Sequence, residues 1–259
     1  ANLNIKNLSA ELGIFLIEKQ MKIQIIPCLK DNYSYLIIDE GSNIACVVDP
    51  SEAGPIIEYL ENTQIKLKFI LNTHHHYDHV GGNQRLKEKY GASIVGYKGD
   101  KERIPGINIL VNDQETWINK NFEAKIIHIP GHTLGHICFY FYKEESVFTG
   151  DTLFSLGCGR IFEGTYEQMF NSLMKLKELP KNTKVFCGHE YTLQNSKFCL
   201  THDKNNLNLR NKINDINTKL KEGLSTIPST IKDEIECNVF LRSHNVKTFS
   251  KLRDLKDNF

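Results

Sequence analysis

The sequence has no marked excess of charge of either sign and no long apolar segment. Lysine and arginine number 32 and aspartate and glutamate 31, so the 259-residue chain carries a formal net charge of +1. A near-neutral chain has no overall electrostatic reason to bind nucleic acid or an anionic membrane as its main partner. Its apolar runs fall well short of the roughly 20 residues that cross a bilayer. We therefore expect neither nucleic acid nor a membrane among its partners.

Cysteine motifs are also missing. The seven cysteines are scattered, and no two have the C-x-x-C spacing of a zinc-binding or redox motif. This distribution predicts reduced, mostly buried thiols, as in a cytoplasmic protein. Residues 1–20 contain only a short apolar run, Leu12 to Ile17, without the basic start of a secretory signal. We interpret them as an N-terminal extension, either a leader remnant, which would place the protein in an organelle, or an artificial addition.

The rest of the chain is typical of a globular protein, with 40% apolar and 24% charged residues. Up to about residue 190, short strand-like runs alternate with a few helix-like segments, which favours an α/β layered sandwich. Beyond that point helical spacing takes over, as at Leu209, Ile213 and Ile216. We predict one domain over residues 21–190 and a smaller helical domain over residues 191–259.

The densest chemical signal is the run THHHYDH at residues 73–79, which follows an apolar strand-like segment. Histidine and carboxylate side chains are the usual ligands of zinc, iron and manganese. Alternation in an extended turn points His74 and His76 the same way, so these two can share one ion. Asp78 and His79 lie at the turn into a helix and can serve a second ion. Packing gains nothing from so many imidazoles, and the run therefore predicts a metal site.

Three later segments each present one candidate ligand directly after a glycine at the end of a predicted strand. Their sequences are PGHT, TGDT and CGHE, and the ligands are His132, Asp151 and His189. Glycine allows the backbone to turn tightly where the side chain is presented. We expect all three side chains to join the 73–79 run at one centre.

The remaining histidines have ordinary explanations. His136 follows His132 by four residues, but ligands on loops need no helical spacing, so we interpret it as a packing residue or a support for a ligand. His75 points away from its two neighbours and is not expected to be a ligand. His128, His202 and His244 lack any ligand context.

The order His-x-His-x-Asp-His, then His132, Asp151 and His189, resembles the ligand set of the metallo-β-lactamase superfamily. Within that superfamily, the chain is similar to the glyoxalase II family of hydroxyacylglutathione hydrolases from about residue 22 to residue 259. The similarity is carried by the runs GCGR at 157–160 and GHEYT at 188–192 and by the helical C-terminal part. The resemblance implies an αββα sandwich, the catalytic domain, followed by a smaller helical substrate-binding lobe. It also implies two divalent metal ions, with zinc expected and iron or manganese as alternatives. Its assignment is His74, His76 and His132 for one ion, Asp78, His79 and His189 for the other, and Asp151 as the bridge.

By the same resemblance, glutathione is recognised by Arg160, Phe162, Tyr191, Arg253 and Lys256. Family members commonly have lysine where Arg160 stands and tyrosine where Phe162 stands. Arginine keeps the positive charge that a substrate carboxylate needs. Phenylalanine lacks the hydroxyl, and an unreplaced hydrogen bond costs about 0.5–1.5 kcal/mol. We therefore expect weaker binding of glutathione thioesters or an altered substrate range.

The implied reaction is hydrolysis of S-D-lactoylglutathione, or a related 2-hydroxyacyl glutathione thioester, to D-lactate and glutathione, the second step of methylglyoxal detoxification. We predict a metal-bridging hydroxide as the nucleophile, aimed by Asp78, because bound metal lowers the pKa of water toward about 7. A thiolate, with a reference pKa near 8.5, leaves without strong general-acid help, which favours a thioester over a lactam.

Other functions remain open. One is a single-iron glutathione persulfide dioxygenase that uses His74, His132 and Asp151 as a facial triad. A nuclease of the same superfamily is disfavoured by the near-neutral charge. A structural metal protein is disfavoured because structural zinc sites are usually closed and rich in cysteine. We expect a monomer whose partner is the glutathione thioester.

Overall fold

The computed structural model describes residues 21–119 and 121–259. The extension predicted at residues 1–20 lies outside the described residues. The first half of the described chain forms a six-stranded sheet in the order β1-β2-β3-β4-β5-β6. Strands β1 to β3 pair antiparallel and β3 to β6 pair parallel. Their bounds are β1 Met21–Cys28, β2 Asn32–Asp39, β3 Ile44–Val48, β4 Lys66–Leu71, β5 Ser93–Tyr97 and β6 Ile109–Val111.

The helices between the parallel strands cover the outer face of this sheet. They are α2 (Gly54–Thr63), the short α3 (Tyr77–Val80) and α4 (Asn83–Tyr90). Helix α2 begins with a proline at its first turn, where the missing N–H costs nothing, and α4 ends at Gly91 in the left-handed conformation. Apolar residues of α2 and α4 pack with Leu36, Val47 and Ile70 of the sheet.

The second sheet has the order β14-β13-β10-β9-β8-β7 and is mostly antiparallel. Its strands are β7 Thr116–Asn119, β8 Phe122–His128, β9 Ile137–Phe141, β10 Ser146–Gly150, β13 Lys184–Cys187 and β14 Ser229–Thr230. A small hairpin, β11 (Leu153–Phe154) and β12 (Gly157–Cys158), follows β10. The inner faces of both sheets meet in one core, in which Tyr35 packs against Phe148 and Phe186.

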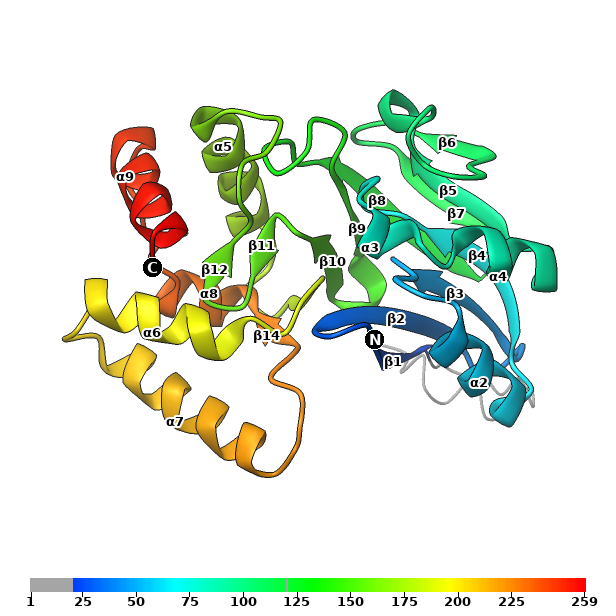
Figure 1. Cartoon of the computed structure of the whole chain (residues 1–259), viewed down its shortest axis with the longest axis horizontal. Helices are drawn as coiled ribbons and strands as arrows, with labels where there is room; N and C mark the ends of the chain where they lie inside the picture. The colour runs from blue at the N-terminus through cyan, green and yellow to red at the C-terminus, as the bar shows by residue number, and fades with distance from the viewer. Residues whose placement is uncertain (1–20, 120) are drawn as a thin grey trace, which may run out of the picture.

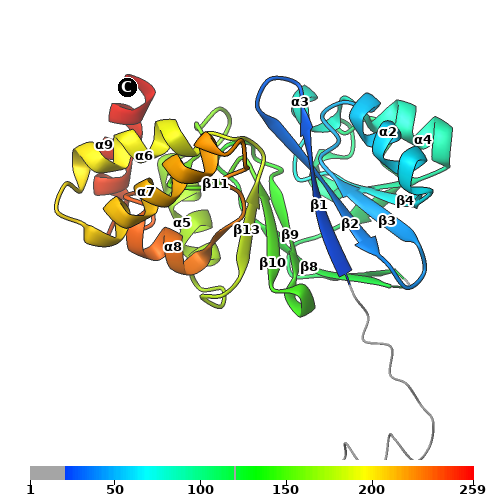
Figure 2. The same cartoon turned by 90° about the horizontal axis from the view of Figure 1, so that it is seen from below.

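Helices cover the far face of the second sheet. They are α5 (Tyr166–Lys177), α6 (Thr192–His202), α7 (Leu207–Lys221), α8 (Ile231–Cys237) and α9 (Val246–Asp257). Figure 1 shows these helices on one side, α2 to α4 on the other and the strands between, and Figure 2 shows the same order from below. The predicted sandwich and the C-terminal helical part are therefore confirmed. One strand, β14, returns from the helical part and pairs with β13.

The structure also corrects and extends local expectations. Helix α5 was not predicted, although Met169, Leu173 and Leu176 give it an apolar face and a Thr165 capping box starts it. Helix α9 ends at Asp257, and Phe259 packs beyond it against Phe198. All seven cysteines are free and buried, as predicted. No helix among the described residues has the length and apolar character needed to span a bilayer.

Candidate metal centre and substrate cavity

The predicted ligands come together at one edge of the sandwich. The 73–79 run follows β4, His132 lies between β8 and β9, Asp151 follows β10 and His189 follows β13. Because these strand ends lie close together, side chains separated by more than 100 residues meet there. The ligand atoms of His74, His76 and His132 lie within 4.8 Å of one another, and so do those of the second triad, Asp78, His79 and His189.

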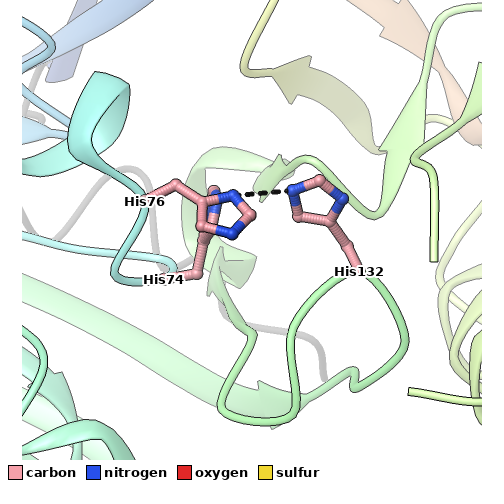
Figure 3. Close-up of side chains that lie close together, drawn as sticks. All are labelled: His74, His76 and His132. Atoms are coloured by element: carbon pink, nitrogen blue, oxygen red, sulfur yellow. Dashed lines mark hydrogen bonds between the residues drawn. The ribbon is translucent and has the colours of Figure 1, made fainter. Parts of the chain in front are cut away.

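The first triad is shown in Figure 3, where His74 and His76 from one segment point toward His132 from the opposite loop. The Nε2 atom of His132 lies 3.0 Å from the Nδ1 atom of His76. The imidazole rings of His74 and His76 are tilted by 74° with centroids 4.7 Å apart. Three imidazoles therefore converge on one small volume from two directions.

Asp151 lies between the two triads. Its Oδ1 atom is 3.3 Å from His79 Nε2, and its Oδ2 atom is 3.3 Å from His189 Nε2 and 3.5 Å from His132 Nε2. A single carboxylate thus contacts members of both groups. A carboxylate in this position could contact a cation held at either group.

Groups behind the imidazoles orient their ligand nitrogens inward. The Nδ1 atoms of His79 and His189 lie 2.9 Å from Asp49 Oδ2 and Asp31 Oδ1 respectively, and that of His132 lies 2.8 Å from a backbone carbonyl oxygen. An outer hydrogen bond of this kind fixes the tautomer and leaves Nε2 for a metal.

Several inward-facing atoms have no hydrogen-bond partner. They are Nε2 of His74, and Nε2 of His79 and Oδ1 of Asp151, which lie 3.3 Å apart without hydrogen-bond geometry; all three are buried. A buried polar atom without a partner costs about 1–3 kcal/mol. Divalent cations at the two triads would give each of these atoms a ligand bond, so the residues present fit a metal centre.

The histidines of the two triads differ in protonation: burial lowers the histidine pKa at the second triad, but contact with Asp151 outweighs it and raises the pKa of His79 and, to about 10, that of His189. Burial, with the neighbouring imidazoles, holds the pKa of His74 well below its usual range and lowers the pKa of His76 to about 4. Both rings are therefore neutral at physiological pH and can donate a lone pair. Burial disfavours the charge on Asp78, but contact with His189 and His79 holds the pKa of this carboxyl well below its usual range. It is therefore ionised.

Glycine is required at two of the turns that present ligands. Gly150 has a φ of +47°, and a Cβ there would lie 2.4 Å from Thr73 Oγ1. A Cβ on Gly188 would lie 2.3 Å from Asp151 Oδ1. The first glycine is needed for backbone conformation and the second for close approach, so larger residues at either position would displace the ligands.

Asp31 and Asp49 were not assigned a role from the sequence. Each is an acid near the end of a strand, which is a weak signal because such acids are common in turns. In the structure Asp49 also accepts hydrogen bonds from the N–H and hydroxyl of Thr73, and Asn32 donates to Asp78 Oδ2 at 3.0 Å. These three residues hold the ligands in place.

We expect Asp31→Ala to weaken metal binding at the Asp78/His79/His189 triad by about 10- to 100-fold, because His189 loses the acceptor that orients it. Titration of metal-free protein should then resolve one weakened and one unchanged site. Glu40→Ala, at an exposed acid just beyond β2, is the matched control. Equal weakening at both sites, or none, would contradict this role for Asp31.

The histidines not expected to be ligands lie outside both triads. His136 is fully buried, stacks on the His74 ring and accepts a hydrogen bond from the Asp151 N–H at 3.1 Å. His75 turns to Asp100 and Glu163, 3.2 and 3.4 Å away. Both contacts support the loops that carry ligands.

A cavity of about 460 Å³ opens beside the centre. It is lined by ligands from both triads, including His76 and His189, and by Asp151. All five residues predicted to recognise glutathione also line it: Arg160, Phe162, Tyr191, Arg253 and Lys256. The structure therefore brings five of the seven predicted metal ligands and all five predicted substrate-binding residues to one cavity, while His74 and His79 are buried behind it.

The five side chains differ in how they are held. The Tyr191 ring stacks on His189 at 4.6 Å, and the exposed Phe162 ring lies 5.2 Å from that of His132. Arg160 is largely exposed, whereas Arg253 is buried and donates to the Cys158 carbonyl oxygen at 2.6 Å. The sequence pattern did not distinguish the exposed cation from the buried one.

Two family models match successive parts of the chain. Residues 30–189 match the metallo-beta-lactamase superfamily, and residues 190–259 match the hydroxyacylglutathione hydrolase C-terminus. A hydroxyacylglutathione hydrolase from Pelagibacter ubique is 73% identical over 239 residues, which are 92% of this chain and 100% of that protein. The chain belongs to the hydroxyacylglutathione hydrolase family. The resemblance drawn from the motifs is confirmed, and so is the expected class of enzyme, a thioester hydrolase.

Solved structures agree with this placement in the superfamily. BLEG-1 B3 metallo-beta-lactamase matches with a TM-score of 0.67 at 21% identity, over 86% of this chain and 100% of that one, which supports the fold alone. TTHA1623, solved in a di-iron-bound form, matches with a TM-score of 0.53 at 26% identity, over 65% of this chain and 91% of that one. Superfamily membership and the two histidine and aspartate clusters support divalent metal ions as cofactors of this hydroxyacylglutathione hydrolase.

Proposed function

We propose that this hydroxyacylglutathione hydrolase cleaves S-D-lactoylglutathione, or a related 2-hydroxyacyl glutathione thioester, at a centre of two divalent metal ions. The observation that carries the proposal is the position of Asp151. Its Oδ2 atom lies 3.5 Å from His132 of the first triad and 3.3 Å from His189 of the second, and the residue also lines the cavity together with Arg160 and Lys256. Metal chemistry and anion recognition therefore share one cavity.

We assign the seven ligands as two sets joined by a bridge. The sets are His74, His76 and His132 for one ion, Asp78, His79 and His189 for the other, and Asp151 between them. Zinc is the proposed metal, since it accepts nitrogen and oxygen ligands readily. Iron and manganese accept the same ligands, and TTHA1623 was solved with two irons.

The chain's own groups supply orientation. When bound, divalent ions lower the pKa of water toward about 7 and polarise an acyl oxygen. Asp78 is ionised, partly exposed to the cavity and held by Asn32, so its carboxylate accepts a hydrogen bond from the nucleophile and aims it at the thioester carbon. The glutathione thiolate then leaves without a protein acid, because thiols are acidic enough.

We propose that the lobe formed by residues 191–259 recognises the glutathione part, while residues 21–190 form the catalytic domain. Tyr191, Arg253 and Lys256 of the lobe line the same cavity as ligands of the catalytic domain. Burial raises the pKa of Tyr191, so its hydroxyl stays protonated and can donate a hydrogen bond. A monomeric state and a cytoplasmic location remain predictions from the sequence.

The experiment that tests the proposed function is hydrolysis of S-D-lactoylglutathione by purified protein, with bound metals quantified on the same sample. We expect hydrolysis with about two metal ions per chain. A protein with two metals and no hydrolysis would refute the substrate assignment. One iron per chain, with oxygen consumed when glutathione persulfide is supplied, would indicate the dioxygenase instead.

Phe162→Tyr should raise kcat/KM for S-D-lactoylglutathione by about two- to tenfold, because a hydroxyl at this position in the cavity regains one hydrogen bond to the peptide part of the substrate. Steady-state kinetics test this. S-D-lactoyl-N-acetylcysteamine has the same acyl thioester without the peptide and should show no gain. An equal gain with both substrates would mean that the hydroxyl acts on the reacting group.

A further inference from the structure

Asp257, at the end of α9, lies between two arginines that line the substrate cavity. Its Oδ1 atom accepts a hydrogen bond from Arg253 Nη2 at 2.9 Å and lies 3.5 Å from Arg160 Nε. Arg160, Arg253 and Lys256 are the cations among the lining residues. A carboxylate of the protein itself therefore faces two of the three cations that could receive a substrate carboxylate.

The two arginines that contact Asp257 differ in how firmly their side chains are held. Arg253 is buried, donates to the Cys158 carbonyl oxygen at 2.6 Å and lies over the Phe240 ring at 5.3 Å, so its position is fixed by several partners. The Arg160 side chain is 61% exposed, and its contact with Asp257 faces solvent. Exposed ion pairs contribute little to stability and exchange readily. Of the two arginines, therefore, only Arg160 is free to exchange Asp257 for another partner.

Lys256 adds a third positive charge at this end of the cavity. Its ammonium lies 5.5 and 5.2 Å from the ring centroids of Phe198 and Phe259, and it has no ion-pair partner among residues 21–119 and 121–259. The other acid on this part of α9, Asp254, accepts a hydrogen bond from the Tyr166 hydroxyl and does not line the cavity. Asp257 is therefore the carboxylate that sets how strongly these cations attract an anion.

We propose that Asp257 limits the affinity of the cavity for the glycine carboxylate of glutathione by occupying Arg160 in the free enzyme and releasing it when that carboxylate binds. This inference rests on the proposed function. Substrate and glutathione product bear the same carboxylate, so a cavity with fully free cations would bind both more tightly without gaining in the chemical step. Asp257 keeps Arg160 compensated between turnovers and limits retention of the product.

The test is Asp257→Asn, which keeps the size and an acceptor oxygen for Arg253 but removes the charge. We expect KM for S-D-lactoylglutathione and the inhibition constant of glutathione to fall by roughly three- to tenfold. The glycine ethyl ester of the same thioester lacks the carboxylate, and its KM should change less than about twofold. An unchanged ratio of acid to ester KM, or a higher KM for the acid, would show that Asp257 only positions Arg253.

Two controls separate the possible failures. Asp254→Asn removes the same charge from the same helix and should leave the acid-to-ester ratio as in the wild type. In an Arg160→Gln background, Asp257→Asn should lose most of its effect, and an undiminished effect would overturn exchange at Arg160. Calorimetry of glutathione binding alone tests the role of Asp257 without any hydrolysis. If S-D-lactoylglutathione is not hydrolysed, that failure refutes only the proposed function.

Discussion

We expect that removing divalent metal from the purified protein will abolish thioester hydrolysis and lower its melting temperature, and that adding zinc will restore both. The physical reason is the set of buried atoms without partners, Nε2 of His74, Nε2 of His79 and Oδ1 of Asp151, each of which gains a bond when cations bind. A ligand at 100 times its Kd stabilises the folded state by about 2.7 kcal/mol. For a chain of this size that corresponds to roughly 5–10 °C.

Activity and thermal melts before and after dialysis against a chelator measure this effect. Chelator already saturated with zinc is the control, since it should change neither quantity. Metal-free protein that keeps both its activity and its melting temperature would contradict a metal centre at the two triads. Loss of activity without a change in melting temperature would mean that the orphaned atoms are satisfied in some other way.

We expect Asp78→Ala to abolish hydrolysis and the milder Asp78→Asn to lower kcat by about a hundred- to ten-thousandfold, with a smaller effect on KM. A positioned carboxylate that accepts a proton or a hydrogen bond from the nucleophile typically contributes a factor of this size. Asp78 Oδ2 is held by Asn32 at 3.0 Å and lies 3.4 Å from His189 Nε2. The amide keeps the shape of the side chain but cannot accept a proton.

Bound metal must be counted in each Asp78 variant, because a lost ion would also lower the rate. Asp215→Asn, at an exposed acid on α7 paired with Lys219, is the matched control and should be as active as the wild type. A metal-loaded Asp78→Asn protein within threefold of the wild-type kcat would remove Asp78 from the mechanism.

Local patterns predicted much of the fold. The strand-like runs before residue 190 correspond to strands of the two sheets, because alternation and apolar runs depend on neighbouring residues only. Helix α5 was missed even though Met169, Leu173 and Leu176 form an apolar face. Helix α5 packs on the far face of the second sheet. That surface is formed by distant segments of the chain, so no local pattern describes it.

The candidate ligands were also visible in the sequence, because His, Asp and Gly in short runs mark strand ends that present metal-binding groups. The residues that hold these ligands in place were not visible in the sequence. His189 depends on Asp31, 158 positions away, and His79 on Asp49. A single acid in a turn has no distinguishing neighbour, so its role appears only when the chain has folded.

The sequence by itself determined the family and the class of reaction and indicated the candidate metal ligands, since these depend on the type and order of side chains. Only the tertiary structure decided that Asp151 lies between two triads, that Arg253 is buried while Arg160 is exposed, and that Asp257 faces both arginines. The physical reason is distance along the chain. Contacts between strand ends and helices far apart in sequence arise from packing of two sheets and a helical lobe, and packing is a property of the whole fold.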